Sequence, residues 1–237
     1  SKWTWITLAV LVLEAVCLWL VYLRVVPDRP VPGGTLHGIG TETIWPAAKL
    51  AILTVVPLTL LFVWSNRFRP HGFWIWLVTF GWGACVATFL SLTLNTAMAQ
   101  HLSIVGDGDP AAAPRAAVFV APFTEEATKA TILFFLAIAL RYRWVNRLSA
   151  IALAGLSGAA FAFVENILYY GRAYRAAART TGAGDPQEAM FQLFQIRGLL
   201  TFFAHPLFTI MTGIGLAIAI RSKSKIVRVF VPVTGFL

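Results

Sequence analysis

Apolar residues along this chain fall into six windows, each long enough to cross a bilayer as a helix of about 20 residues. The windows cover residues 3–26, 44–64, 73–99, 116–140, 148–170 and 198–220. A further apolar run begins at Ile226 and reaches Leu237, which indicates the start of another span. The pattern therefore predicts an all-α, polytopic transmembrane helix bundle with six complete spans plus the start of a seventh.

The composition agrees with a membrane protein. Of 237 residues, 58% are hydrophobic and 12% are charged, and the mean hydropathy is +0.75, unlike a soluble domain. The net charge is +9, but its Lys and Arg residues lie in short loops, so the expected partner is the lipid bilayer and not nucleic acid. Cys17 and Cys85 lie inside apolar windows, which argues against a disulfide framework. The first window is expected to be a retained helix and not a removed signal peptide.

Short basic loops predict the orientation of the spans. The connections 65–72, 141–147 and 221–228 carry nine Lys or Arg and no acid, so the positive-inside rule places them in the cytoplasm together with the amino terminus. The opposite connections hold Asp28, Glu42, Asp107, Asp109, Asp185 and Glu188. The fit is incomplete, because these outer connections also contain Arg172, Arg175, Arg179 and Arg197.

The longest connection, residues 171–197, is expected to be extracytoplasmic and to contain a short amphipathic helix. The motif Asp185-Pro186-x-Glu188 supplies a cap, a proline for the first helical position and an acid for the first turn. The apolar side of this helix would consist of Met190, Phe191 and Phe194. That side would lie in the membrane interface or continue into the sixth span.

Ionisable and amide side chains interrupt three of the windows: Glu125 and Glu126, Glu165 and Asn166, and His205. Such groups at membrane depth indicate a functional site. Counted from the basic loop that closes each window, Glu125, Glu165 and His205 lie 16, 18 and 16 residues away. At about 1.5 Å per helical residue, all three lie roughly 24 to 27 Å from one face. The shared depth predicts one common site.

The first motif combines Glu125 and Glu126 with Lys129, which is spaced to pair with either carboxylate on a helix. The second carboxylate would then be free, and a carboxylate in a low-dielectric setting suits a general base or acid that activates water. The spacing leaves open which glutamate is free. In the structural alternative, both glutamates are solvated charges at the start of a helix.

Small residues lead onto the second motif, since Ala154, Gly158 and Ala162 recur every four residues before Asn166. This stripe predicts a close contact between helices and places Asn166 in the protein interior, one step around the helix from Glu165. An amide there can donate to an oxyanion, and a carboxylate can orient a histidine or bind a metal. A polar clamp between two helices is the structural alternative.

The third motif is His205, which shares a polar stripe with Thr209 and Thr212. A single buried histidine is often structural, but its shared depth with the other motifs favours a functional role. Pro206 leaves one carbonyl without its helical donor, a gap that a cavity or a neighbouring helix can fill. Two weaker candidates for supporting roles stand in the first and third windows: Glu14 and Asn95.

Together, the motifs resemble the PrsW family of intramembrane proteases, which is related more distantly to the CAAX prenyl endopeptidases and to a scaffold subunit of γ-secretase. The resemblance rests on Glu125-Glu126-x-x-Lys129, on Phe161-x-x-x-Glu165-Asn166 and on His205 followed by Gly213. It covers roughly residues 122–220. It implies one membrane-embedded protease domain, residues 1–237, with its motif-bearing core at about 116–220.

The resemblance implies an intramembrane endopeptidase that hydrolyses a peptide bond near the extracytoplasmic side of the membrane. Glu125 or Glu126 would activate water, and the catalytic set would be completed by His205, Glu165 and Asn166. The supporting residues would be Lys129 and Thr209. The implied substrate is a single-pass, membrane-anchored protein such as an anti-sigma factor, and the implied location is a prokaryotic plasma membrane.

The need for a metal stays open, because this family has been treated both as metalloproteases and as glutamate proteases. CAAX endopeptidases carry a histidine in the second motif, where this chain has Glu165 and Asn166. Zinc is therefore a candidate cofactor, with Glu126, Glu165 and His205 as its candidate ligands. The presence of one histidine at this depth favours glutamate-activated water without a metal.

Two other functions fit parts of the pattern. Carboxylates and a histidine in membrane helices also form proton relays, so a proton-coupled transporter is one alternative. Against it, the groups gather at one depth, and the sequence shows neither the broken helices nor the inverted repeats of many transporters. A non-catalytic scaffold that binds membrane helices through the same cavity is the other alternative.

Overall fold

The computed structural model describes residues 2–31, 33–68, 71–105, 120–139, 147–180, 182 and 184–232, with the backbone alone at 102–105. The predicted outer connection at 106–114 and most of the basic loop 141–147 lie outside these residues. The elements in chain order are α1 (Lys2–Val25), β1 (Arg29–Val31), β2 (Gly34–Leu36), α2 (Thr41–Ser65), α3 (Phe73–Gly81), the π-helix η1 (Trp82–Ala87), α4 (Thr88–Val105), α6 (Ala121–Ala139), α7 (Arg147–Arg179), α8 (Pro186–Phe194), the π-helix η2 (Gln195–Leu200), α9 (Ala204–Arg221) and α10 (Lys225–Phe230).

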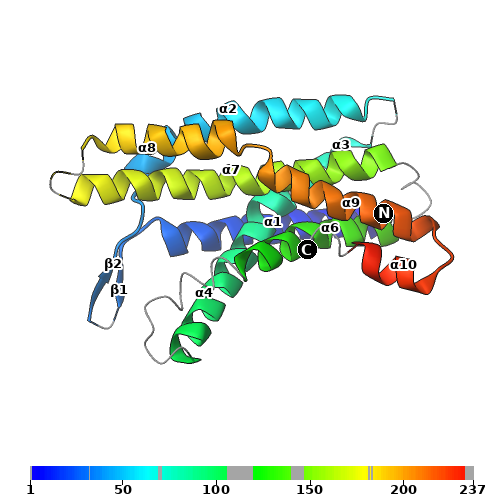
Figure 1. The fold of residues 1–237 in the computed structure, drawn as a ribbon, viewed down its shortest axis with the longest axis horizontal. Helices are drawn as coiled ribbons and strands as arrows, with labels where there is room; N and C mark the ends of the chain where they lie inside the picture. Colours follow the sequence, from blue (N-terminus) through cyan, green and yellow to red (C-terminus); the bar gives the residue numbers. More distant parts are fainter. Residues whose placement is uncertain are drawn as a thin grey trace.

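The fold is an all-α membrane helix bundle with one small antiparallel hairpin, β1–β2 (Figure 1). Among the described residues, five helical segments are long and apolar enough to cross a membrane: Lys2–Val25, Thr41–Ser65, Phe73–His101, Arg147–Arg179 and Pro186–Arg221. Helix α6 does not qualify by composition, because its 19 residues include Glu125, Glu126 and Lys129. Helix length and apolarity therefore support five of the six predicted spans.

Helix α7 forms the centre of the bundle and packs against α2, α8, α9 and η1 (Figure 1). In the most apolar 18-residue window of α7, 78% of the residues are buried, whereas in that of α1 only 17% are buried. Small residues permit the close packing: a Cβ on Gly155 would lie 2.2 Å from the Phe62 ring, and one on Gly158 would lie 2.8 Å from the His205 carbonyl oxygen. The predicted helix contact along this small-residue stripe is thus confirmed, with α9 as its partner.

The predicted window 198–220 is not one continuous helix. Helix η2 ends at Leu200, the chain turns at Thr201 with a backbone hydrogen bond to Ile196 (2.9 Å), and α9 begins at Ala204. Pro206 therefore occupies the first turn of α9, where a backbone N–H needs no partner within the helix. The expectation that no helix is broken was wrong, and the break lies immediately before His205.

The predicted outer connection 171–197 is mostly helical, because α7 continues to Arg179 and α8 follows at Pro186. The expected cap is confirmed, since the Asp185 carboxylate accepts a hydrogen bond from the Gln187 backbone N–H at 2.9 Å. On the apolar side of α8, Met190 and Phe194 are buried against α2 and α7 whereas Phe191 is exposed, and α8 continues directly into η2. Of the two expected arrangements, the structure therefore shows continuation toward the sixth window.

The contact at Gly158 gives a stability prediction. Replacing Gly158 with Ala is expected to lower the free energy of unfolding by about 1 to 3 kcal/mol, because the added Cβ meets backbone atoms of α9 that cannot rotate away. Thermal or denaturant unfolding in detergent would measure the change. Gly72→Ala is the matched control, since a Cβ there has no atom within 4 Å; equal stability of both variants would contradict the predicted contact.

Candidate active site

Three helices bring the three polar motifs together. Glu125 lies in the second turn of α6, Glu165 in the second half of α7 and His205 in the first turn of α9. One side-chain oxygen or nitrogen from each of these residues lies within 4.8 Å of the others. The Nε2 atom of His205 is 2.9 Å from Oε2 of Glu165. The close packing of α7 on α9 at Gly158, about two helical turns from Glu165, fixes this approach.

Glu126 is held separately, in a buried ion pair with Lys129. The Thr209 hydroxyl donates to the other oxygen of Glu126 at 2.9 Å. Nζ of Lys129 also lies 2.9 Å from Nδ1 of His205 and 4.4 Å from the centre of the Phe161 ring. Lys129 thus pairs with Glu126 and leaves Glu125 to face the cavity.

Asn95 and Thr124 orient the free glutamate. The Asn95 amide donates to Oε1 of Glu125 at 3.5 Å, and the Thr124 hydroxyl donates to the amide oxygen of Asn95. Asn95 was a weak candidate from the sequence, because it is a single amide in a long apolar window. Its position on α4, which packs against α6, makes it a direct neighbour of the site.

Arg197 in η2 is a site residue that the sequence analysis did not identify. Its guanidinium donates to Oε2 of Glu165 at 2.6 Å and to Oδ1 of Asn166 at 3.0 Å. It also lies 4.0 Å from the centre of the Tyr169 ring. A possible signal was its place beside an apolar window, eight residues before His205, where it had been counted as an ordinary loop arginine.

A cavity of about 550 Å³ joins these groups between α4, α6, α7 and α9. Its polar lining includes Asn95, Glu125, Glu165, Tyr169, Arg172, Arg197 and His205. Apolar residues such as Leu92 and Leu168 complete the wall, and the volume falls in the usual range for ligand sites. Asn166 does not line the cavity but contacts it through Arg197, while Glu14 is buried against Gly81 and is also absent from the lining.

The residues present fit a metal ion by type and spacing. Two carboxylates and one imidazole are common zinc ligands, and the group consists of Glu125, Glu165 and His205. The candidate set from the sequence contained Glu126 instead, which the structure ties to Lys129 and Thr209. Binding through Nε2 of His205 requires that this nitrogen carry no proton, so that Nδ1, which faces Lys129, would carry it.

Comparison with known proteins gives one family match. The family model described as PrsW family intramembrane metalloprotease matches residues 71–237, a region that contains all three motifs and the cavity. No curated protein and no solved structure matches the chain significantly. Because the match covers more than half of the chain, and because its acidic and imidazole groups converge inside a membrane helix bundle, this protein belongs to the PrsW family and is an intramembrane protease.

Proposed function

We propose that the protein hydrolyses a peptide bond in a single-pass, membrane-anchored protein, near the extracytoplasmic side of the membrane. The observation that carries this proposal is the convergence of Glu125 with the Glu165–His205 pair on one cavity among membrane helices. An anti-sigma factor with an extracytoplasmic domain is the proposed natural substrate, which follows from the family resemblance. The same resemblance supports a prokaryotic plasma membrane as the proposed location.

In the proposed reaction, Glu125 is the general base. It accepts a proton from water while the water oxygen attacks the peptide carbonyl carbon, and it returns that proton to the nitrogen as the C–N bond breaks. Arg197, on the cavity wall, has N–H groups beyond those bound to Glu165 and Asn166, and these supply donors for the developing oxyanion. His205 orients Glu165, Glu165 holds Arg197 in place, and Asn166 acts through Arg197.

The chemistry of a bound zinc ion would be compatible with this site. Held by Glu125, Glu165 and His205, it would polarise the water or the peptide carbonyl as a Lewis acid. We favour water activation by the glutamate itself, because Lys129 pairs with Glu126 and in its charged form can only donate to Nδ1 of His205. The imidazole then carries its proton on Nε2 and donates it to Glu165.

The proposed topology adds α6 to the five spans above, which makes six, and takes α10 as the beginning of a seventh. It places the amino terminus in the cytoplasm. The basic connections 65–72, 141–147 and 221–228 support this orientation. The hairpin β1–β2 and the carboxyl end of α7 then face the extracytoplasmic side, at the opposite end of the bundle from α10 (Figure 1). The active-site cavity would open in the outer part of the membrane.

Transport and scaffolding remain the competing functions. Broken helices like the one before His205 are also found in transporters. Here, however, the carboxylates and the histidine form one cluster and are not spaced across the bilayer as in a proton relay. The decisive experiment places the purified protein in liposomes with a single-pass substrate. Cleavage within or beside the membrane supports the proposal, whereas solute uptake without cleavage supports a transporter and stable co-purification without cleavage supports a scaffold.

Replacing His205 with Ala tests the choice between the two mechanisms. We expect at least a hundredfold loss of kcat/KM, because Glu165 loses the imidazole that orients it and Arg197 is then held less firmly, and we expect no change in bound metal. Elemental analysis of the native and variant proteins measures the metal content. Stoichiometric zinc in the native protein that is lost in the His205→Ala variant would overturn the metal-independent mechanism but not the protease function.

A further inference from the structure

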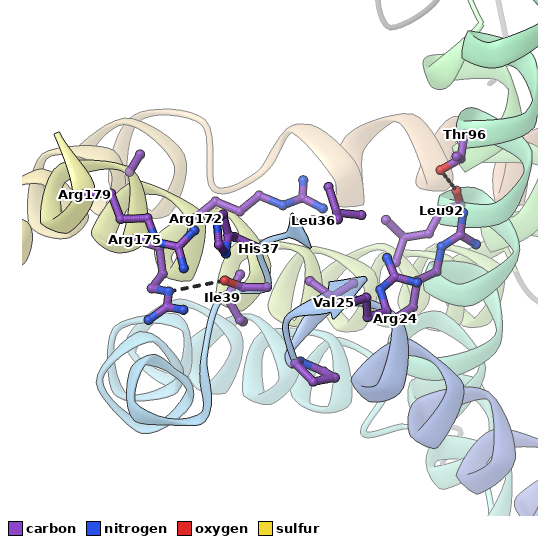
Figure 2. A pocket seen from close by; sticks show the side chains of 14 residues that line it. Arg24, Val25, Leu36, His37, Ile39, Leu92, Thr96, Arg172, Arg175 and Arg179 are labelled. Atoms are coloured by element: carbon purple, nitrogen blue, oxygen red, sulfur yellow. Dashed lines mark hydrogen bonds between the residues drawn. The ribbon is translucent and has the colours of Figure 1, made fainter. Parts of the chain in front are cut away.

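A second cavity, of about 490 Å³, lies next to the active-site cavity and is strongly basic. Five arginines line it: Arg24 at the end of α1, Arg29 on β1, and Arg172, Arg175 and Arg179 on α7. Figure 2 shows the three α7 arginines on one side of this hollow and Arg24 on the other. None of its lining residues is acidic. We call it the arginine pocket.

Nearby carboxylates neutralise two of these arginines. Arg175 pairs with Glu42 at 2.7 Å and with Asp28 at 3.4 Å, and Arg179 pairs with Asp28 at 3.5 Å. Hydrogen bonds from His37 and from the Gly38 backbone N–H lower the pKa of Asp28 to about 2, so this carboxylate is ionised at neutral pH. The negative charge of Asp28 is therefore already paired with Arg175 and Arg179 and does not neutralise the remaining arginines of the pocket.

The other three arginines have no carboxylate partner among the described residues. Arg24 donates to the Thr93 hydroxyl at 2.9 Å, and Arg172 lies 5.7 Å from the centre of the Tyr169 ring. The Nε of Arg29 is buried without a hydrogen-bond partner in the described structure. Three uncompensated guanidinium groups around one cavity favour an anionic ligand, and guanidinium geometry matches both carboxylates and phosphates.

The arginine pocket adjoins the active-site cavity. Leu92, Thr96 and Arg172 line both. The ring of Tyr169 contacts Arg172 of the pocket and Arg197 of the active site. Along α7, Arg172 lies seven residues beyond Glu165, or about 10 Å toward the hairpin end. An extended peptide covers this distance with about three residues.

From this arrangement we infer that the arginine pocket binds an acidic segment of the protein substrate, three to five residues from the scissile bond on its extracytoplasmic side. The inference rests on the proposed function, because it assigns the pocket to the same bound polypeptide. The wall shared with the catalytic cavity favours a substrate segment over an anionic lipid headgroup. The hairpin, which supplies Arg29 and Leu36 to the wall, would then contact the substrate where it leaves the membrane.

The test uses two single-pass substrates that differ only in this segment, one with Asp-Glu at the third and fourth positions and one with Asn-Gln. In phosphatidylcholine liposomes, the native protein is expected to cleave the acidic substrate with a roughly tenfold lower KM, equivalent to about 1.4 kcal/mol. Arg29→Gln and Arg172→Gln should each remove most of that preference. Lys225→Gln on α10 is the matched loss of one positive charge and should leave it unchanged.

Equal cleavage of both substrates, or a preference that survives both arginine replacements, would overturn the inference. So would a result in which phosphatidylglycerol stimulates both substrates equally and Arg29→Gln abolishes only that stimulation, since the pocket would then be a lipid site. If neither substrate is cleaved, the proposed function fails, and binding of the two peptides to the Glu125→Gln protein decides the pocket separately. If the acidic peptide binds more tightly and this difference depends on Arg29, the result supports the arginine pocket as a site for an acidic segment.

Discussion

Replacing Glu125 with Gln is expected to reduce proteolysis about a hundredfold to ten-thousandfold while leaving the folded protein intact. A carboxamide cannot accept the proton of the attacking water, and general base catalysis contributes about 10²- to 10⁴-fold to the rate. Glutamine keeps the size of the side chain and an oxygen that can accept the hydrogen bond from Asn95. The measurement is kcat/KM on a single-pass substrate in liposomes, together with thermal unfolding of both proteins.

Two further variants make this result specific. Glu188→Gln removes an exposed carboxylate on α8 that does not line the active-site cavity, and it should change neither activity nor stability. Glu126→Gln should destabilise the protein, because it removes the partner of Lys129. Full activity in Glu125→Gln, combined with a stable but inactive Glu126→Gln protein, would instead identify Glu126 as the base.

The second large effect concerns the buried ion pair between Lys129 and Glu126. Replacing Lys129 with Met is expected to lower the free energy of unfolding by about 3 to 5 kcal/mol, because the Glu126 carboxylate would remain buried without its counter-charge. Lys129 is 0% exposed, so water cannot take its place without a rearrangement of the helices. The replacement also removes the contact to Nδ1 of His205 and should therefore lower activity.

A double-mutant cycle separates the charge pair from packing. Lys129→Met with Glu126→Gln should recover much of the lost stability, since no unpaired buried charge remains. Lys49→Met is the control, because Lys49 is exposed on α2 and its loss should cost no more than about 0.5 kcal/mol. A Lys129→Met protein as stable as the native one, with no coupling to Glu126, would show that the pair does not stabilise the fold.

Much of the framework was predictable from local sequence. The apolar windows correspond to helices because crossing a bilayer requires about 20 apolar residues with all backbone groups paired. The cap at Asp185 was predictable because it depends on neighbours within one turn. Conversely, the charges that mark α6 as a site helix also keep it from qualifying as a membrane span by composition.

The choice between the two glutamates shows what spacing alone leaves undecided. Lys129 can reach either Glu125 or Glu126 along the helix, and the selection is made by Thr209 of α9, which donates to Glu126, and by Asn95 of α4, which donates to Glu125. Both partners are distant in sequence. A pairing that depends on neighbouring helices can be identified only after those helices are packed together.

The sequence by itself determined a helical membrane protein, the three polar motifs and their nearly equal depth, because span length and helical rise are local properties. Only the tertiary structure decided that Glu125 joins Glu165 and His205, that Arg197 holds Glu165, and that a helix break precedes His205. It also gathered arginines from α1, β1 and α7 into one pocket. These features depend on side chains of distant segments meeting across packed helices, which periodicity along one segment cannot specify.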